Sequence, residues 1–456
     1  MSELDVGEST IPNDCLEEFH DSGTIYFSTN DSKNSTEDIK DSENSGKSLD
    51  EESGKSNQKE ERVGRFGTIM NLLNSLLGAG IFTLPGEFGE VGLIPSIVLL
   101  SFAAYIAYVC SKMLVKIEQD IEGNGLDDIS LKIFGHGGQV FVSFMTLIFC
   151  LAGNVGYVVI SCDIIQQWIE LSNFNVKYWT RFGITFAYSI IPIGLSIPKS
   201  LRFLSYFSSL TIGIMIFYIL VIIIRFPTVI KTMNLSNSSF KLGNAGLGIF
   251  SALSMFFLNF TLPITTLPII NKYNKDLRKR YISLLWTCAS CLLILVIPSV
   301  LGYMMVFNES ESKLIFSYKK FQKDMLFNIL KAGCFLAVTF SYPILNKPIL
   351  GSWSQFFFKI NDADTLPLKK LAIIHIISHT ITICIAAFYP KAMNILDYTG
   401  SFGCIMDVTI PGLLWYVYYR PKINTFYFWG SWFLTIFGVF LAVAVIAMQI
   451  RDIFVH

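Results

Sequence analysis

Residues 67–92 read GTIMNLLNSLLGAGIFTLPGEFGEVG, a segment apolar enough to cross a bilayer that also contains residues that interrupt a helix. A membrane-spanning helix needs about 20 mostly apolar residues. Gly78 and Gly80 weaken a helix because glycine has the most backbone freedom to lose, and Pro85 lacks the amide hydrogen that helix bonding uses. Irregular backbone at membrane depth is tolerated only where it is buried in protein or lines a cavity. The stretch therefore predicts an interrupted membrane helix beside a central site.

A second stretch, LSMFFLNFTLPITTLPIINKY at 253–273, has the same character, with Pro263 and Pro268 inside an apolar run. Both stretches contain Phe-Thr-Leu-Pro, at 82–85 and at 260–263. Interruptions at corresponding positions in the two halves of a transporter mark its binding site. A stripe of small residues for close helix packing is the alternative interpretation. Breaks in both stretches favour a site.

Similar apolar runs fill the chain from residue 66 onward and predict an all-α integral membrane protein with about eleven transmembrane helices in the lipid bilayer. The runs are 66–88, 91–116, 138–170, 178–198, 202–226, 244–271, 281–307, 325–356, 369–389, 393–419 and 425–450. The halves 66–226 and 244–419 hold five runs each. Five is an odd number, so the second half must cross in the opposite sense, which is an inverted repeat.

Charge divides the chain into two parts. Residues 1–65 hold 17 of the 35 acids and 7 of the 35 bases, whereas the whole chain is 52% hydrophobic and 15% charged. An acidic leader with few apolar residues cannot bury enough surface to fold, so we predict a disordered cytosolic tail at 1–61 and a transporter domain at 62–456. Soluble domains carry about 25% charged residues, so the low charge content also indicates a lipid-facing surface.

Loop charges predict the orientation, because Lys and Arg favour the cytosolic side. The basic cluster within 272–280 is expected in the cytosol with the tail, and 227–243 and 308–323 on the opposite side. Glycosylation sequons at Asn234, Asn237 and Asn308 fall on that opposite side.

Ionisable residues deep in a span are functional candidates. Asp407, in Gly-Cys-Ile-Met-Asp, could carry a proton or could be a neutral carboxyl that bonds neighbouring helices. Asp163 and Lys347 are nearer the ends of runs and are expected at the interface. His375 and His379 are four residues apart on one helix face, a spacing that favours hydrogen bonds between helices over metal binding. We predict no metal site.

An α-amino acid suits a pair of broken helices. The free amide hydrogens and the dipole at the start of a half-helix favour a carboxylate. Free carbonyls at the end of a half-helix can accept an ammonium or coordinate a cation. No charged side chain is needed, so we expect a small amino acid as the substrate.

The residues at these breaks resemble a known family. The residues Asn71, Asn74, Gly78-Ala79-Gly80-Ile81, Leu84-Pro85 and Gly92 are similar to the first-helix signature of the amino acid/auxin permease family, which includes vacuolar amino acid transporters and sodium-coupled neutral amino acid transporters. The resemblance continues at Thr339-x-Ser341-x-Pro343 and more loosely at Pro268-Ile-Ile-Asn271 and Pro411-Gly412-Leu413. It covers about residues 62–450.

The resemblance implies a leucine-transporter-like fold with a 5+5 inverted repeat and interrupted first and sixth helices. It also implies a substrate held at the two breaks, by Ser75, Gly78, Ala79, Gly80, Ile81, Phe257, Asn259 and Thr261. A coupling cation is implied near Asn74, Thr339 and Ser341. The chain departs from the family where Asn259-Phe-Thr261 replaces a His-containing stretch, and at Glu87, where the family has a small residue. The preferred amino acid therefore stays open.

The motifs exclude several classes of function. The sequence has no P-loop and no G-x-S-x-G or H-E-x-x-H, so it predicts neither a primary pump nor an enzyme. We predict a secondary active amino acid transporter coupled to Na⁺ or H⁺, with no other cofactor and no nucleic acid partner. The alternative is an amino-acid-sensing receptor on a transporter scaffold that signals through the tail, whose protein partners are unknown. The vacuolar or lysosomal membrane and the plasma membrane are both open.

Overall fold

The computed structural model describes residues 64–123, 125–171, 178–197, 202–232, 241–244, 246–307, 315, 321–360, 363–420 and 425–455. These residues belong to one compact unit, Lys59–His456. The predicted tail at 1–61 and the three sequons lie outside the described residues.

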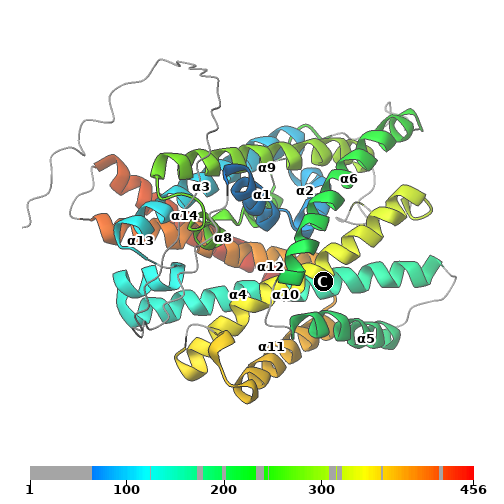
Figure 1. Cartoon of the computed structure of the whole chain (residues 1–456). Coiled ribbons are helices and arrows are strands. Elements are labelled where there is room, and N and C mark those ends of the chain that lie inside the picture. Colours follow the sequence, from blue (N-terminus) through cyan, green and yellow to red (C-terminus); the bar gives the residue numbers. More distant parts are fainter. Residues whose placement is uncertain are drawn as a thin grey trace, which may run out of the picture. The chain divides into compact units, whose positions relative to one another are not determined.

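Every regular element in the described residues is a helix (Figure 1). The first half contains α1 (Arg65–Leu76), the short 3₁₀ helix η2 (Ala79–Phe82), α2 (Leu84–Val91), α3 (Leu93–Asp120), α4 (Leu126–Leu171), α5 (Tyr178–Ser196) and α6 (Arg202–Thr232). The second half contains α7 (Gly248–Leu258), α8 (Leu262–Ile270), α9 (Leu277–Val306), α10 (Met325–Phe358), η6 (Ala363–Thr365), α11 (Leu368–Phe388), α12 (Ala392–Cys404), the π-helical turn η7 (Ile405–Thr409) and α13 (Ile410–Tyr419). The last helix is α14 (Thr425–Val455).

Within the described residues, nine helical segments are long and apolar enough to cross a membrane. The first run is not among them because its break divides it into pieces of 12, 4 and 8 residues, each too short to span. Helix α5 is not among them either. The polytopic helical architecture is confirmed, and the number eleven stays a prediction.

The third span differs from its predicted start at residue 138, because α4 begins at Leu126. Gly135 interrupts α4 with a φ of 73° and a ψ of −166°, a conformation that glycine adopts far more readily than other residues. A short helical segment therefore precedes the long helix that follows Gly135.

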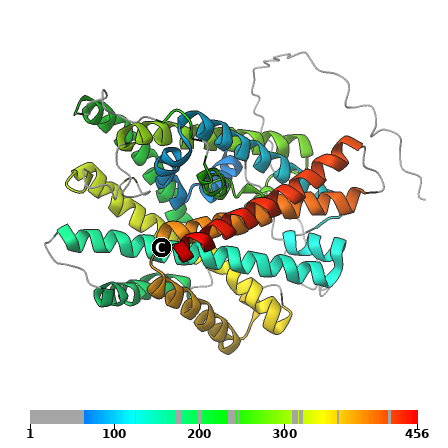
Figure 2. The ribbon, with the colours of Figure 1, turned by 180° about the vertical axis from the view of Figure 1, so that it is seen from behind.

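The helices pack in two groups, which are separated in Figure 1. In one group, α3 and α9 pack against each other and against the short helices of the first and sixth spans. In the other, α4, α5, α10 and α11 pack together. Helix α6 contacts both α9 and α10, and α12 contacts both α7 and α4, so these two helices join the groups. Figure 2 shows α14 (red) lying along α12 and α13 (orange), which it contacts.

The outer helices expose large apolar side chains that a lipid environment would cover, among them Ile216, Leu293 and Val443. Inside, one hydrophobic cluster runs through both halves of the chain, from Leu72 to Val445. The two broken spans contribute many of its fully buried members, so the breaks lie in the core.

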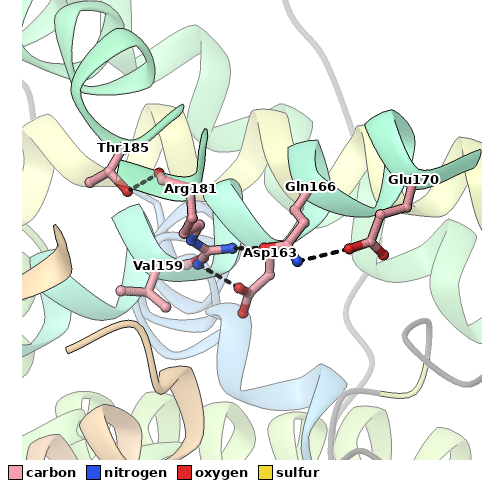
Figure 3. Close-up of polar contacts among 6 residues, drawn as sticks. All are labelled: Val159, Asp163, Gln166, Glu170, Arg181 and Thr185. Carbon is pink, nitrogen blue, oxygen red and sulfur yellow. Dashed lines mark hydrogen bonds and ion pairs between the residues drawn. The ribbon is translucent and has the colours of Figure 1, made fainter. Parts of the chain in front are cut away.

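An ion pair fixes α4 to α5 (Figure 3). Arg181 Nη2 lies 2.5 Å from Asp163 Oδ1, and Arg181 also donates to Gln166 Oε1 at 2.9 Å and to the carbonyl of Val159 at 3.3 Å. Gln166 in turn donates to Glu170 at 2.8 Å. Asp163, expected at the interface, is therefore paired with the following helix.

Candidate functional site

The first span is interrupted as the sequence predicts. Helix α1 ends at Leu76, Leu77 and Gly78 are extended, and the chain then makes the turn η2 before α2 begins. Pro85 stands in the first turn of α2, where its missing amide hydrogen is not needed. Gly78 and Pro85 thus lie on either side of the interruption.

The sixth span is interrupted in the same way. Helix α7 ends at Leu258, and α8 begins at Leu262 after Asn259, Phe260 and Thr261. Thr261 has a ψ of 45°, outside the helical range, and Pro263 again stands in the first turn of the second piece. Both halves of the chain therefore open with a broken helix.

The two breaks pack directly on each other. A Cβ added to Gly80 would lie 2.8 Å from Asn259 Oδ1 and 2.9 Å from its Nδ2. Asn259 Nδ2 donates to the carbonyl of Met255 at 2.8 Å, which fixes the amide against Gly80. Nearby, Ser75 donates to Thr265 Oγ1 at 3.1 Å and so links α1 to α8.

The structure brings together most of the residues predicted to hold substrate. Gly80, Ile81, Phe257, Asn259 and Thr261 are buried, and Ser75 and Gly78 are half-buried. The backbone of Ala79 lies in η2, and its side chain is not among those described.

Asp407 lies beside the sixth-span break. It is in the π-helical turn η7 and is buried. Its Oδ1 accepts a hydrogen bond from the backbone amide of Ile264 at 3.3 Å, in the first turn of α8. Its Oδ2 is buried without a hydrogen-bond partner among the described residues. A carboxylate at the start of a helix interacts favourably with the helix dipole, so α8 can stabilise the charged form.

The predicted cation ligands come from two helices. Thr339 Oγ1 donates to the carbonyl of Phe335 at 2.6 Å and is 2.9 Å from Tyr188 Oη on α5. Ser341 is two residues further along α10, so its side chain points to another face of the helix. Asn74 is on α1, which packs against α8 and α9, and α10 meets the first span at η2. Because Pro343 has no amide hydrogen, the Thr339 carbonyl lacks its usual helical donor.

Two residues that lie at the breaks, and a buried lysine elsewhere on α10, were not predicted from the sequence. Tyr157 on α4 faces the first break, with its Oη 3.6 Å from a Cβ built on Gly78, and Thr265 bonds Ser75. Neither residue stands out in its apolar run. Lys331 on α10 is fully buried, and its amine has no hydrogen-bond partner in the described part of the chain. A charged residue inside the run 325–356 was a signal that could have found it. Glu87, in α2, is also fully buried.

Known proteins resemble this chain over most of its length. A family model described as transmembrane amino acid transporter protein matches residues 63–451. Sodium-coupled neutral amino acid transporter 7 of Danio rerio is 20% identical over 364 residues, 76% of this chain and 77% of that protein. Vacuolar amino acid transporter 5 of Schizosaccharomyces pombe is 21% identical over 368 residues, 78% of this chain and 85% of that protein.

Two solved structures share the fold. The inward-facing conformation of Mhp1 has a TM-score of 0.59 at 12% identity and covers 86% of this chain and 91% of that one. The Eremococcus coleocola manganese transporter in complex with an aromatic bis-isothiourea compound has a TM-score of 0.54 at 13% identity, with 89% and 90% covered. These similarities confirm the predicted leucine-transporter-like fold.

Proposed function

Because this chain belongs to the transmembrane amino acid transporter family, we propose that it carries a small amino acid across a membrane by alternating access, coupled to a proton gradient. The observation that carries the proposal is the contact of the two broken helices at Gly80 and Asn259, with Asp407 bonded to the start of α8. Each break supplies backbone groups without helical partners in the core of the protein.

The substrate's two charged groups have separate places in this proposal. Free amide hydrogens at the start of η2 receive the carboxylate, because unpaired amides at the start of a helical segment favour an anion. Free carbonyls at the end of α1 and α7 receive the ammonium. Ser75 and Asn259 add side-chain polarity at the breaks, and Phe257 and Ile81 exclude water from them.

Asp407 is the proposed proton site. When ionised, it accepts a bond from Ile264 and is stabilised by the start of α8. When protonated, it loses its charge and gains a donor, so its attraction to α8 weakens. Helix α8 contacts η7 directly. Protonation of Asp407 therefore changes the preferred position of α8 relative to the helices that it packs against.

Sodium coupling is the second candidate. The Thr339 carbonyl freed by Pro343, the Ser341 hydroxyl and the Asn74 amide offer oxygen ligands, which hard cations prefer. Thr339 Oγ1, however, is already bonded to Tyr188 and Phe335. Because these hydrogen bonds already occupy the Thr339 hydroxyl, we favour the proton over sodium as the coupling ion.

A sensing receptor is not favoured, because the family model and the fold are those of transporters. The relatives include a vacuolar and a sodium-coupled transporter. We place this chain in a vacuolar or lysosomal membrane, where an acidic lumen supplies a proton gradient, with the plasma membrane as the other candidate.

The test is uptake of a panel of labelled amino acids into proteoliposomes, with a pH gradient and a Na⁺ gradient imposed separately. The proposal expects accumulation of at least one small neutral amino acid under the pH gradient alone. Accumulation under the Na⁺ gradient alone would instead identify Na⁺ as the coupling ion, bound near Asn74 and Ser341. Uptake of no amino acid under either gradient would contradict the proposal.

A further inference from the structure

A polar cavity of about 240 Å³ lies within the helix group formed by α4, α5, α10 and α11. The described residues that line it come from these four helices and from the segments that join them, and they include Asp127, Asn346, Lys347, Ser352, Asp364 and His375. The cavity is therefore separate from the contact between the first and sixth spans. Its lining includes the start of α4 at Asp127, the end of α5 at Ser196 and the start of α11 at Leu371, which the predicted order of spans places on the same side as the tail.

One wall of the cavity carries a buried donor that the protein leaves unused. The Asn346 side chain is 1% exposed, and its Oδ1 accepts a hydrogen bond from Ser378 Oγ at 3.2 Å. Its Nδ2 has no hydrogen-bond partner among the described residues. A buried donor left unpaired costs about 1–3 kcal/mol, so an acceptor that enters the cavity recovers that free energy.

The cavity also presents both signs of charge. Lys347 Nζ pairs with Asp364 Oδ2 at 3.2 Å, in an ion pair of which each side chain is partly exposed. Asp127 accepts one hydrogen bond, from Ser143 Oγ to Oδ1 at 3.2 Å. An ionised carboxylate can accept about four hydrogen bonds, so Asp127 retains acceptor capacity.

We propose that this cavity is a second binding site for a zwitterionic amino acid. The ligand carboxylate accepts from Asn346 Nδ2 and Lys347 Nζ, and the ligand ammonium donates to Asp127. A zwitterion satisfies both sets of groups without adding net charge, which a simple anion or cation does not. The volume is below the range of about 300–1,000 Å³ for drug-sized ligands and suits a small solute. The choice of an amino acid rests on the proposed function.

The site is connected to the middle of α10 by hydrogen bonds. His375, which lines the cavity, places Nδ1 3.3 Å from His379 Nε2, and His379 Nδ1 lies 2.9 Å from Tyr342 Oη. Tyr342 is buried beside Ser341 and Pro343, in the part of α10 where a helical hydrogen bond is missing.

The test counts labelled amino acid bound per chain at saturation, by equilibrium dialysis of the purified full chain in nanodiscs. We expect two molecules per wild-type chain. Asn346→Leu, which keeps the side-chain size but removes the donor, should lower the affinity of one site at least tenfold and reduce the count to one. Ser352→Phe, which fills the cavity from another position, should give the same count. Asn328→Leu, on the same helix outside the cavity, should still bind two.

The Gly80→Val variant separates this inference from the proposed function. If both are right, Gly80→Val binds one molecule, and Gly80→Val with Asn346→Leu binds none. A single wild-type site that is lost in Gly80→Val but kept in Asn346→Leu and Ser352→Phe would overturn the cavity site and leave the transport site standing. A single site with the opposite pattern would support the cavity site and contradict the proposed central site.

Discussion

Gly80 and Asn259, which are 179 positions apart in the chain, pack so closely that a Cβ on Gly80 would lie 2.8 Å from the Asn259 side-chain oxygen. Real Cβ atoms essentially never approach a neighbour within 3.0 Å, so only glycine fits without displacement. This contact holds the break of the first span against the break of the sixth. It is the structural basis for placing one site across both halves of the inverted repeat.

Replacing Gly80 with Val should abolish transport. The added side chain must push away the Asn259 amide, which is held by its bond to Met255, and such overpacking costs about 1–3 kcal/mol. Labelled amino acid uptake measures the loss, and size-exclusion chromatography checks that the variant folds.

Two further variants test whether the Asn259 contact is the cause. Gly213→Ala adds a methyl group in α6 where nothing lies within 4 Å, so it should keep wild-type uptake. Gly80→Ala should lose most uptake, because its Cβ already meets the Asn259 side-chain oxygen at 2.8 Å. Full activity of Gly80→Val would mean that the glycines do not form the site.

Asp407→Asn should remove the dependence of uptake on the pH gradient. The amide has nearly the same size, but it cannot exchange a proton with the solvent on either side. In the wild type, a gradient of one pH unit supports about tenfold accumulation for one proton per substrate. The variant should equilibrate the amino acid without accumulating it. Asp397→Asn is the matched control, because Asp397 is a buried carboxyl bonded to Ser251 and Gln449, away from α8. Accumulation by Asp407→Asn equal to that of the wild type would exclude Asp407 as the proton site.

Ser341→Ala should leave uptake unaffected by external Na⁺, as it is in the proton-coupled wild type. The hydroxyl lies on a different face of α10 from Thr339 and has no role in the proposed proton step. Initial rates measured across a series of Na⁺ concentrations check this. A reduced apparent Na⁺ affinity in this variant would instead identify a sodium site.

Arg181→Met should destabilise the protein by about 1–3 kcal/mol, because it leaves the partly exposed Asp163 carboxylate without its partner (Figure 3). The Arg181 side chain is only 9% exposed, and the variant also removes its hydrogen bonds to Gln166 and to the carbonyl of Val159. Lys116→Met breaks the more exposed pair with Asp120 and should cost less than about 1 kcal/mol. Denaturant unfolding in detergent compares the two variants, and equal losses would contradict a structural role for the pair.

Cysteines introduced at Lys275 and Leu242, both exposed, should react with an impermeant reagent from opposite sides of the membrane. The basic cluster within 272–280 is predicted in the cytosol, and 227–243 on the other side. Two native cysteines, Cys15 in the tail and the exposed Cys384, should first be replaced by Ser. Labelling of both positions from one side would reject the predicted orientation.

The helical membrane fold could be predicted from the sequence because it depends on local features of the chain. Apolar length predicts each span, and Gly78, Pro85 and Pro263 mark the two breaks within a few residues. The start of α4 was misjudged because residues 126–134 are less apolar than a span, and Gly135 gives no sign from sequence alone of whether it ends a loop or bends a helix.

The site was only partly predictable because its remaining contacts join distant segments. Asp407 stood out as a charge inside an apolar run, but its bond to Ile264 depends on how η7 packs on α8. Tyr157 is an ordinary aromatic residue in its own helix, and only packing places it against Gly78. The polar cavity is formed by four helices, and no spacing along the chain indicates it.

The most direct test of proton-coupled amino acid transport is to measure the internal pH of proteoliposomes with a trapped indicator while amino acid is added outside, with no initial pH gradient. Wild-type vesicles should acidify as the labelled amino acid enters, and Asp407→Asn vesicles should take up amino acid without acidifying. Entry of amino acid into wild-type vesicles with no change in internal pH would contradict proton-coupled transport.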